Sequence, residues 1–298
     1  MRASKKELQQ ELLKVFHYFD FFNHPLLVNE VWKYAGVKLT IAQVEFTLNT
    51  LVDQGKLVLQ DGFYALSDNS FIISERISNL KLNAKRHRQA KLISKVLNHL
   101  PFVKGVGISG SLSKNGATPG SDIDFFLITD IHKVWTVKAL AIILKKLLFF
   151  GSHKYLCVNY LLAQDNLSLK KKNQFQAIEA ITLIPVYGNA VFKSFFEQND
   201  WITEYYPNNY PPNHFEVLDR TSWFKKMMEF IFDGQFGENF ELKAMNAFEK
   251  HGVSKYGKKE GSNVSYKRNE SVYFPNDFET IVLENYEQRI RVLSSQSI

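Results

Sequence analysis

The 298-residue chain is 45% hydrophobic and 22% charged, and it carries a formal net charge of +7 at pH 7. This composition is that of an ordinary globular protein with room for more than one domain, and its 14% aromatic content excludes long disorder. Cys157 is the only cysteine, which excludes an intramolecular disulfide and favours a reducing compartment. The basic balance favours polyanionic partners such as nucleotides or nucleic acid, although lysine-rich solvated faces produce the same balance.

The N-terminal sequence lacks the apolar core of a signal peptide. The most apolar stretch, residues 139–150, contains two lysines and is too short to span a bilayer. We therefore expect a cytoplasmic protein without a membrane span.

Residues 1–70 are expected to form three helices followed by a β-hairpin. Apolar residues at helical spacing predict the helices over 7–22, 28–34 and 41–54, and Asp61-Gly62 predicts the tip of the hairpin. This order resembles a winged helix-turn-helix module. The third helix has no Arg or Lys at its polar positions, and phosphate contacts normally supply most of the affinity for DNA. DNA binding is therefore not favoured, and docking on another domain or on a partner protein is the preferred interpretation.

A long basic helix is expected over residues 70–100, directly before the motif described next. Its seven basic side chains allow two interpretations. They could meet a triphosphate or a nucleic acid, or they could form the solvated side of a connecting helix.

Two short apolar runs carry the polar motif of the chain. The first run, residues 103–108, predicts a buried strand and is followed at once by a turn that contains Gly110 and Ser111. A ten-residue spacer then leads to Asp122 and Asp124, which open the second apolar run. The layout is a strand, a tight turn, a loop, and a strand that bears two aspartates.

These residue types suit a metal-bound triphosphate. Side chains two residues apart on a strand point to the same face, so we expect the carboxylates of Asp122 and Asp124 to lie side by side. A divalent cation relieves their repulsion, and Mg²⁺ prefers oxygen ligands and often keeps phosphate oxygens in its shell. Gly110 lets the backbone approach a phosphate, and Ser111 can donate from its N–H and its hydroxyl.

The motif resembles the signature of the nucleotidyltransferase superfamily, which includes polymerase-beta-like enzymes and minimal nucleotidyltransferases. The matching strings are Ile108-Ser109-Gly110-Ser111 and Gly120-Ser121-Asp122-Ile123-Asp124-Phe125.

The resemblance covers residues 100–165 and implies an α/β (α+β) fold with a mixed sheet. It also implies that Asp122 and Asp124 bind Mg²⁺ or Mn²⁺, and that Gly110, Ser111 and Ser121 contact a nucleoside triphosphate.

The chain departs from the family at two positions. In the family, a third carboxylate on a later strand binds one metal and helps to activate the attacking hydroxyl. Asn159 stands at that position, and an amide is uncharged and is no general base. Asp165, Glu179 or a group of the substrate are the alternatives for its role. Lys114 stands where minimal members often carry an arginine-rich turn, and it is either a phosphate contact or an exposed loop lysine.

The remaining residues, 169–298, are expected to form a mainly helical region. The expected helices lie over 170–182, 189–200, 221–232 and 277–293, and residues 251–268 are expected to form a loop rich in Gly, Ser and Lys.

Three regions follow from these patterns: a winged-helix-like module at 1–70, a nucleotidyltransferase domain with its leading basic helix at 71–168, and the helical region at 169–298. The expected function is metal-dependent transfer of a nucleoside monophosphate from a nucleoside triphosphate such as ATP. The acceptor could be a small molecule, a protein or an RNA end. Asp122, Asp124 and Asn159 are the candidate catalytic residues. The alternative is a catalytically weak nucleotide-binding regulatory protein that uses its winged-helix module for interactions.

Overall fold

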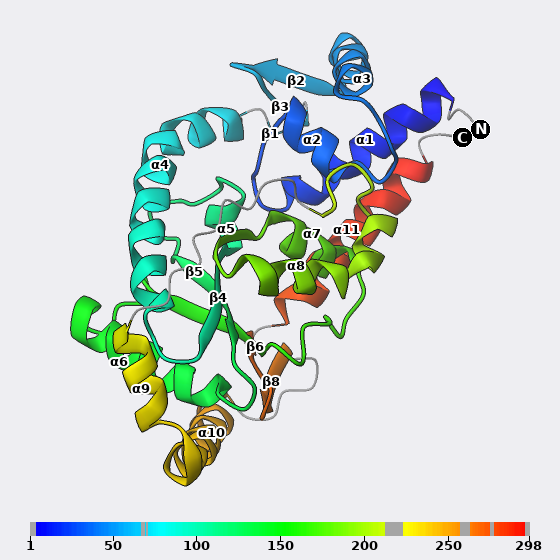
Figure 1. The fold of residues 1–298 in the computed structure, drawn as a ribbon. Coiled ribbons are helices and arrows are strands. Elements are labelled where there is room, and N and C mark those ends of the chain that lie inside the picture. Colours follow the sequence, from blue (N-terminus) through cyan, green and yellow to red (C-terminus); the bar gives the residue numbers. More distant parts are fainter. Residues whose placement is uncertain are drawn as a thin grey trace.

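A six-stranded mixed sheet with helices on both faces forms the centre of the protein (Figure 1). The structure is a computed structural model, and it describes residues 4–66, 69, 71–211, 223–256, 263–274 and 277–295. Within those ranges, none of the helices has the length and apolar character needed to cross a membrane.

The N-terminal region forms three helices and a small antiparallel sheet in the strand order β1-β3-β2. Its elements are α1 (Lys5–Asp20), β1 (Leu26–Leu27), α2 (Val28–Tyr34), α3 (Ile41–Asp53), β2 (Leu57–Gln60) and β3 (Phe63–Leu66). Ser4 begins α1 with a capping box, and Thr40 does the same for α3. Asp61 and Gly62 both have positive φ values, as a two-residue hairpin turn requires. The resemblance of this region to a winged helix stays a prediction.

The middle region supplies three neighbouring strands of the main sheet. Its elements are α4 (Phe71–Asn98), β4 (Val103–Ser109), α5 (Gly110–Ser113), β5 (Asp124–Thr129), α6 (Val134–Phe149) and β6 (Cys157–Ala163). Strands β4 and β5 are antiparallel, whereas β5 and β6 are parallel and are joined through α6. The long helix and the strands follow the expectation from apolar periodicity.

The C-terminal region is mostly helical but also contributes three strands to the same sheet, whose order is β7-β4-β5-β6-β9-β8. Its elements are α7 (Gln174–Thr182), β7 (Ile184–Tyr187), α8 (Asn189–Glu197), the 3₁₀ helix η1 (Asp200–Glu204), α9 (Trp223–Ile231), α10 (Gly234–Tyr256), β8 (Asn263–Lys267), β9 (Glu270–Phe274) and α11 (Phe278–Ser295).

The expected loop at 251–268 is wrong where the structure describes it, because α10 continues to Tyr256 and β8 begins at Asn263. The six residues between these two elements lie outside the described residues. Strand β9 pairs with β6, more than 100 positions earlier in the chain, and β8 extends the sheet beyond it. The local amino-acid composition does not indicate a pairing strand so far away in the sequence.

Each face of the main sheet has its own hydrophobic core. Helices α4, α6 and α10 cover one face, on which Trp135 of α6 is fully buried. The other face packs against α7 and α8, and its core continues into the N-terminal helices without a break. Phe126 of β5 and Leu12 of α1 therefore belong to one core, so the N-terminal region is packed onto the sheet.

Candidate active site

The glycine turn lies directly against the second aspartate of the motif. Ser109, the last residue of β4, pairs with Asp124, the first residue of β5. Gly110 follows with a φ of 68°, and a Cβ atom at this position would overlap the Asp124 carboxylate. Both the left-handed backbone and the close approach require glycine. The structure therefore brings the turn and Asp124 into contact.

Asp122 lies just before β5 rather than on it, so the expectation that both aspartates share one regular strand is wrong. Strand β4 ends opposite Asp124, and no strand remains to pair with Asp122 on that side. The intervening Ile123 is held by the start of β6 and the chain just before it. Its N–H donates to the Lys154 carbonyl at 3.2 Å, and its carbonyl accepts from the N–H of Cys157, the first residue of β6, at 3.0 Å.

Asp124 is a carboxyl group in an unfavourable place for a negative charge. Burial is the main cause that raises its pKa to about 6, and the negative charge of Asp122 raises it further. Asn159 donates its Nδ2 to Oδ1 of Asp124 at 3.2 Å. Among the described residues, no Lys or Arg forms an ion pair with either aspartate.

Two neighbouring carboxylates without a protein cation fit a bound divalent metal. The described part of the chain contains no group of three or more His, Cys, Asp or Glu side chains arranged to hold a metal. Asp122 and Asp124 would therefore need further oxygen ligands from a triphosphate and from water.

Asn159 occupies a β-bulge beside Asp124. The register between β5 and β6 pairs Phe125 with Val158 and Phe126 with Tyr160, so Asn159 is the extra residue. Its Oδ1 accepts a hydrogen bond from the Cys157 thiol at 3.2 Å. Both ends of the amide are thus engaged next to Asp124, and the bulge directs a neutral side chain to the position where the family resemblance implies a carboxylate.

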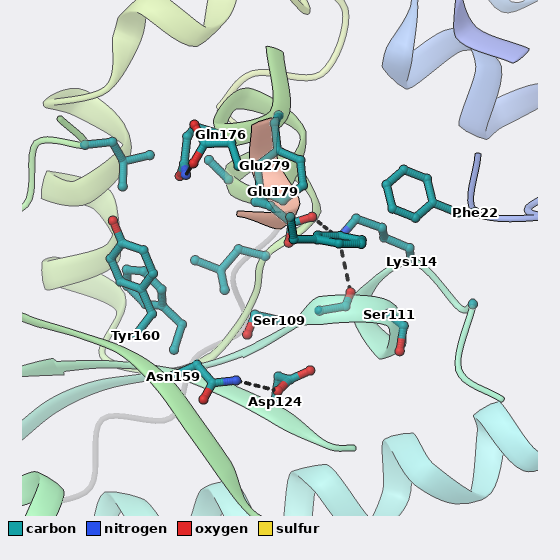
Figure 2. Close-up of a pocket in the computed structure, with 18 of the residues that line it drawn as sticks. Phe22, Ser109, Ser111, Lys114, Asp124, Asn159, Tyr160, Gln176, Glu179 and Glu279 are labelled. Carbon is teal, nitrogen blue, oxygen red and sulfur yellow. Dashed lines mark hydrogen bonds and ion pairs between the residues drawn. The ribbon is translucent and has the colours of Figure 1, made fainter. Parts of the chain in front are cut away.

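Lys114 and Glu179 face each other above this position (Figure 2). Lys114 follows α5, and its Nζ lies 2.9 Å from Oε1 of Glu179 and 3.1 Å from the Gly110 carbonyl. The Lys114 side chain is 14% exposed, which does not fit an ordinary loop lysine. Glu179 belongs to α7. Asp165, in contrast, is exposed beyond the far end of β6 and does not line this site.

The basic helix α4 supports the loop before Asp122 through hydrogen bonds from two of its side chains. Arg86 is buried, and it donates to the carbonyls of Ser121 at 2.6 Å and Pro119 at 3.2 Å. The Asn83 side chain exchanges two hydrogen bonds with the backbone of Ala117, at 2.9 and 3.0 Å. These two buried polar side chains hold the loop instead of facing a ligand.

Ser111 and Ser121 lie in different surroundings. Ser111 lines the cavity described below. The hydroxyl of Ser121 accepts from Thr118 N–H at 2.9 Å within the loop, and Ser121 is absent from the cavity lining. Its local role is to close a turn before the aspartates.

A cavity of about 350 Å³ opens above Asp124 and Asn159. The site motif forms its floor, α7 and α11 contribute Gln176, Glu179 and Glu279, and Phe22 and Tyr160 lie on opposite sides in Figure 2. Residues near the end of α1 also line it, including Tyr18 and His24. No local pattern predicts these N-terminal residues, because they reach the site only through tertiary packing.

The chain matches one known family over part of its length. Residues 90–180 match the family model described as a nucleotidyltransferase domain. No curated protein and no solved structure shows significant similarity to the chain. The matched segment runs from the end of α4 through β6 to α7, and so includes Gly110, Asp122, Asp124, Asn159 and Glu179. The chain therefore carries a nucleotidyltransferase domain of the nucleotidyltransferase superfamily.

Proposed function

We propose that this protein is a metal-dependent nucleotidyltransferase that moves a nucleoside monophosphate from a nucleoside triphosphate to an acceptor hydroxyl. The contact between Gly110 and the half-buried Asp124 carboxylate is the observation that carries this proposal. It joins a close-approach backbone turn to a carboxylate that has no Lys or Arg ion-pair partner among the described residues, at the floor of a cavity. The single cysteine supports the cytoplasm as the place of action.

The side chains at the site have distinct roles in this proposal. Asp122 and Asp124 would hold Mg²⁺ or Mn²⁺, and the ion would neutralise the carboxylates and the charge that develops on the phosphates. Gly110 and Ser111 would receive the triphosphate. Lys114 would leave Glu179 for a phosphate oxygen, because a triphosphate presents more negative charge than one carboxylate.

That exchange frees Glu179 to act as the base that Asn159 cannot be. The acceptor oxygen forms a bond to the α-phosphorus of the triphosphate, and the bond from that phosphorus to the bridging oxygen of the β-phosphate breaks. Pyrophosphate leaves, and the hydroxyl proton passes to Glu179 and then to solvent. The protein contributes mainly by orienting the two substrates and by placing charge.

A second candidate function is nucleotide sensing without efficient turnover. The neutral Asn159 beside Asp124 favours it, because the third carboxylate of the family is absent at this position. Such a protein would bind the triphosphate and its metal tightly but would release little pyrophosphate.

Position-specific labels distinguish the two functions. The protein is incubated with Mg²⁺, a small-molecule cell extract, and a triphosphate labelled either at the α- or at the γ-phosphate. Transferase activity predicts that the α-label enters a new product while the γ-label appears only in pyrophosphate. Asp122→Ala and Asp124→Ala should each abolish the product. Tight nucleotide binding without any labelled product would favour the sensor.

Glu179→Gln tests the proposed base. We expect a loss in turnover of about 100-fold or more, as is typical when a general base is removed, with nucleotide affinity unchanged or increased because Lys114 is released. Asp165→Asn is the matched control and should leave turnover unchanged. Unaltered turnover in Glu179→Gln would assign the base to another group. Asn159→Asp should raise turnover if the missing carboxylate limits the reaction.

A further inference from the structure

We infer that the acceptor is a small, uncharged molecule with an aromatic body and a hydroxyl group, bound in the cavity above Asp124 and Asn159. This inference rests on the proposed nucleotidyl transfer and names the second substrate of that reaction.

The cavity wall is unusually rich in aromatic rings. Phe or Tyr supplies eight of its 22 lining residues, whereas aromatic residues make up 14% of the chain. These eight rings are those of Tyr18, Phe19, Phe22, Phe126, Tyr160, Phe175, Phe195 and Phe278. Rings of this kind bind a flat aromatic ligand by offset stacking and by edge contacts, in addition to the apolar area that they bury.

The rings come from different parts of the chain and are held in place by contacts with one another. Phe126 and Tyr160, on neighbouring strands, stack with their centroids 5.1 Å apart. Phe278, at the start of α11, lies 6.0 Å from Phe22 and 6.2 Å from Phe175. The wall is therefore largely formed before any ligand enters, which lowers the entropic cost of binding.

The cavity has the size and position of an acceptor site. Its volume of about 350 Å³ lies at the lower end of the range for small-molecule sites. Asp124 borders the cavity and Asp122 does not. Gly110, Ser111 and Lys114, which would receive the triphosphate, also border the cavity, so the phosphates would lie along its floor between these residues and Asp122. A hydroxyl held among the aromatic rings above that floor can approach the α-phosphorus from the opposite side. In-line transfer needs this arrangement, because the attacking and leaving oxygens lie on opposite sides of the phosphorus.

Charge at the cavity disfavours a nucleic acid as the acceptor. Lys114 is the only Lys or Arg among the described lining residues, and Glu179 already neutralises it. Glu279, another charged residue of the lining, pairs with Lys171 at 3.2 Å, so the described lining residues offer a phosphate backbone no Lys or Arg that is not already paired with a carboxylate. Nucleic-acid sites require the opposite, since phosphate contacts supply most of their affinity. The basic residues that give the chain its net positive charge are thus not concentrated around this cavity.

The test uses 2-(2-naphthyl)ethanol, an uncharged aromatic alcohol, as the probe, with the full-length protein. Binding is measured by calorimetry, and each variant is also titrated with MgATP. Ala180→Trp fills the cavity from α7, and Phe278→Ala removes a ring that is 44% exposed at the rim, so the second variant carries little risk of misfolding. Phe46→Ala, on α3, is the matched control, because Phe46 is 68% exposed and does not line the cavity.

We expect one probe molecule to bind the wild type, with affinity lowered about fivefold in Phe278→Ala and by more than about tenfold in Ala180→Trp. Phe46→Ala should bind as the wild type does, all variants should bind MgATP normally, and a short RNA should not displace the probe. With α-labelled ATP, the probe should become a labelled nucleotidyl ester.

Three results would overturn the inference. They are normal MgATP binding without probe binding, probe binding that both cavity variants leave unchanged, and displacement of the probe by RNA. A different pattern identifies failure of the proposed function itself. In that pattern the cavity variants weaken probe binding, but the wild-type protein binds none of the four nucleoside triphosphates in the presence of Mg²⁺. That pattern would leave an aromatic-ligand site but remove its role as acceptor site.

Discussion

Asp124, a candidate metal ligand, illustrates how a carboxyl group can reduce the stability of its own fold. Burial and Asp122 raise its pKa to about 6, above the usual value near 3.9 of an unfolded chain. The folded protein therefore binds more protons than the unfolded chain between about pH 4 and pH 6. The stability that comes from protonated Asp124 is present at low pH and is lost as the pH rises through about 6.

Asp124→Asn should accordingly abolish nucleotidyl transfer and stabilise the metal-free protein. We expect the free energy of unfolding at pH 7.5 to rise by about 1–2 kcal/mol, a value reduced for the partial exposure of the site. The gain should vanish below pH 4. Urea unfolding at both pH values measures it, and the exposed Asp165→Asn is the control. A variant less stable than the wild type at pH 7.5 would refute this account of Asp124.

His24 has the opposite dependence on pH. Burial lowers its pKa well below 6.5, and the positive charges of Arg76 and Lys114 lower it further. The unfolded chain takes up a proton near pH 6.5 that the folded protein resists, so stability is lost as the pH falls below 6.5. His24→Gln should remove this loss. The variant should gain up to about 1.4 kcal/mol per pH unit relative to the wild type between pH 6.5 and 5. A constant difference across that interval would contradict a buried neutral imidazole.

The aspartates and the glycine turn could be predicted from the sequence because they depend on neighbours in the chain. A strand end, a left-handed glycine and a short loop bring Gly110 and Asp124 together within 15 positions. Glu179 was only one of several alternatives, and His24 was not foreseen. Both reach the site through the packing of distant helices, which local patterns do not encode.

At the scale of elements, helix α4 supports the loop before Asp122. Arg86→Lys keeps the charge but cannot span the carbonyls of Ser121 and Pro119 with a planar fork. We expect turnover to fall about tenfold through displacement of Asp122, with a smaller change in thermal stability. The exposed Arg88→Lys on the same helix is the control. Equal turnover in the two variants would show that the loop is positioned without Arg86.

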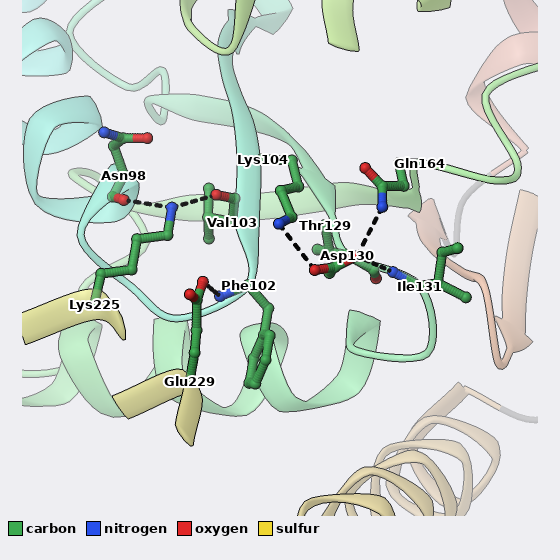
Figure 3. Close-up of polar contacts among 10 residues, drawn as sticks. All are labelled: Asn98, Phe102, Val103, Lys104, Thr129, Asp130, Ile131, Gln164, Lys225 and Glu229. Carbon is green, nitrogen blue, oxygen red and sulfur yellow. Dashed lines mark hydrogen bonds and ion pairs between the residues drawn. The ribbon is translucent and has the colours of Figure 1, made fainter. Parts of the chain in front are cut away.

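Helix α9 is attached to the opposite end of the sheet by buried polar contacts (Figure 3). Lys225 donates to the carbonyls of Asn98, at 3.1 Å, and Val103, and Glu229 accepts from the Phe102 N–H at 2.9 Å. Burial lowers the pKa of Lys225, because it disfavours the charged amine. The charged form therefore depends on its hydrogen bonds to these two carbonyls.

Lys225→Met should leave two carbonyls without this donor and should destabilise the protein by about 1–3 kcal/mol. Thermal unfolding provides the measurement. Lys226→Met, at an exposed neighbouring position, is the matched control. If the two variants unfold at the same temperature, the contacts shown in Figure 3 do not hold α9 to the sheet.

Secondary-structure elements that depend on nearby residues could be predicted from the sequence, whereas elements that depend on distant pairing could not. Helices α1 and α3 were predictable because each carries apolar residues at helical spacing and a capping box. Strands β7 and β9 were not, because each pairs with a strand that lies far away in the sequence. The expected mainly helical region therefore also completes the main sheet.

At the scale of the whole molecule, the N-terminal region is part of the site and not an appendage. Its core is continuous with that of the sheet, and Arg76 of α4 pairs with Glu30 of α2 at 2.6 Å. Asp20, at the end of α1, pairs with Arg289 of α11, and the two helices lie side by side in Figure 1. Regions far apart in the chain thus enclose one cavity.

We therefore predict a single cooperative unfolding transition for the protein. Calorimetry should give a ratio of calorimetric to van't Hoff enthalpy close to one, because the shared core couples the regions. Two resolved transitions would instead support the three independent regions that the sequence suggests. A ligand of the cavity should raise the temperature of the whole transition.

The most direct test of the account is a calorimetric titration of the protein with nucleoside triphosphates, with Mg²⁺ and with a chelator in its place. We predict saturable 1:1 binding of at least one triphosphate that requires Mg²⁺ and is lost in the Asp122→Ala, Asp124→Ala double variant. Absence of binding to all four triphosphates, or binding that the double variant and the chelator leave unchanged, would contradict the proposed nucleotide site.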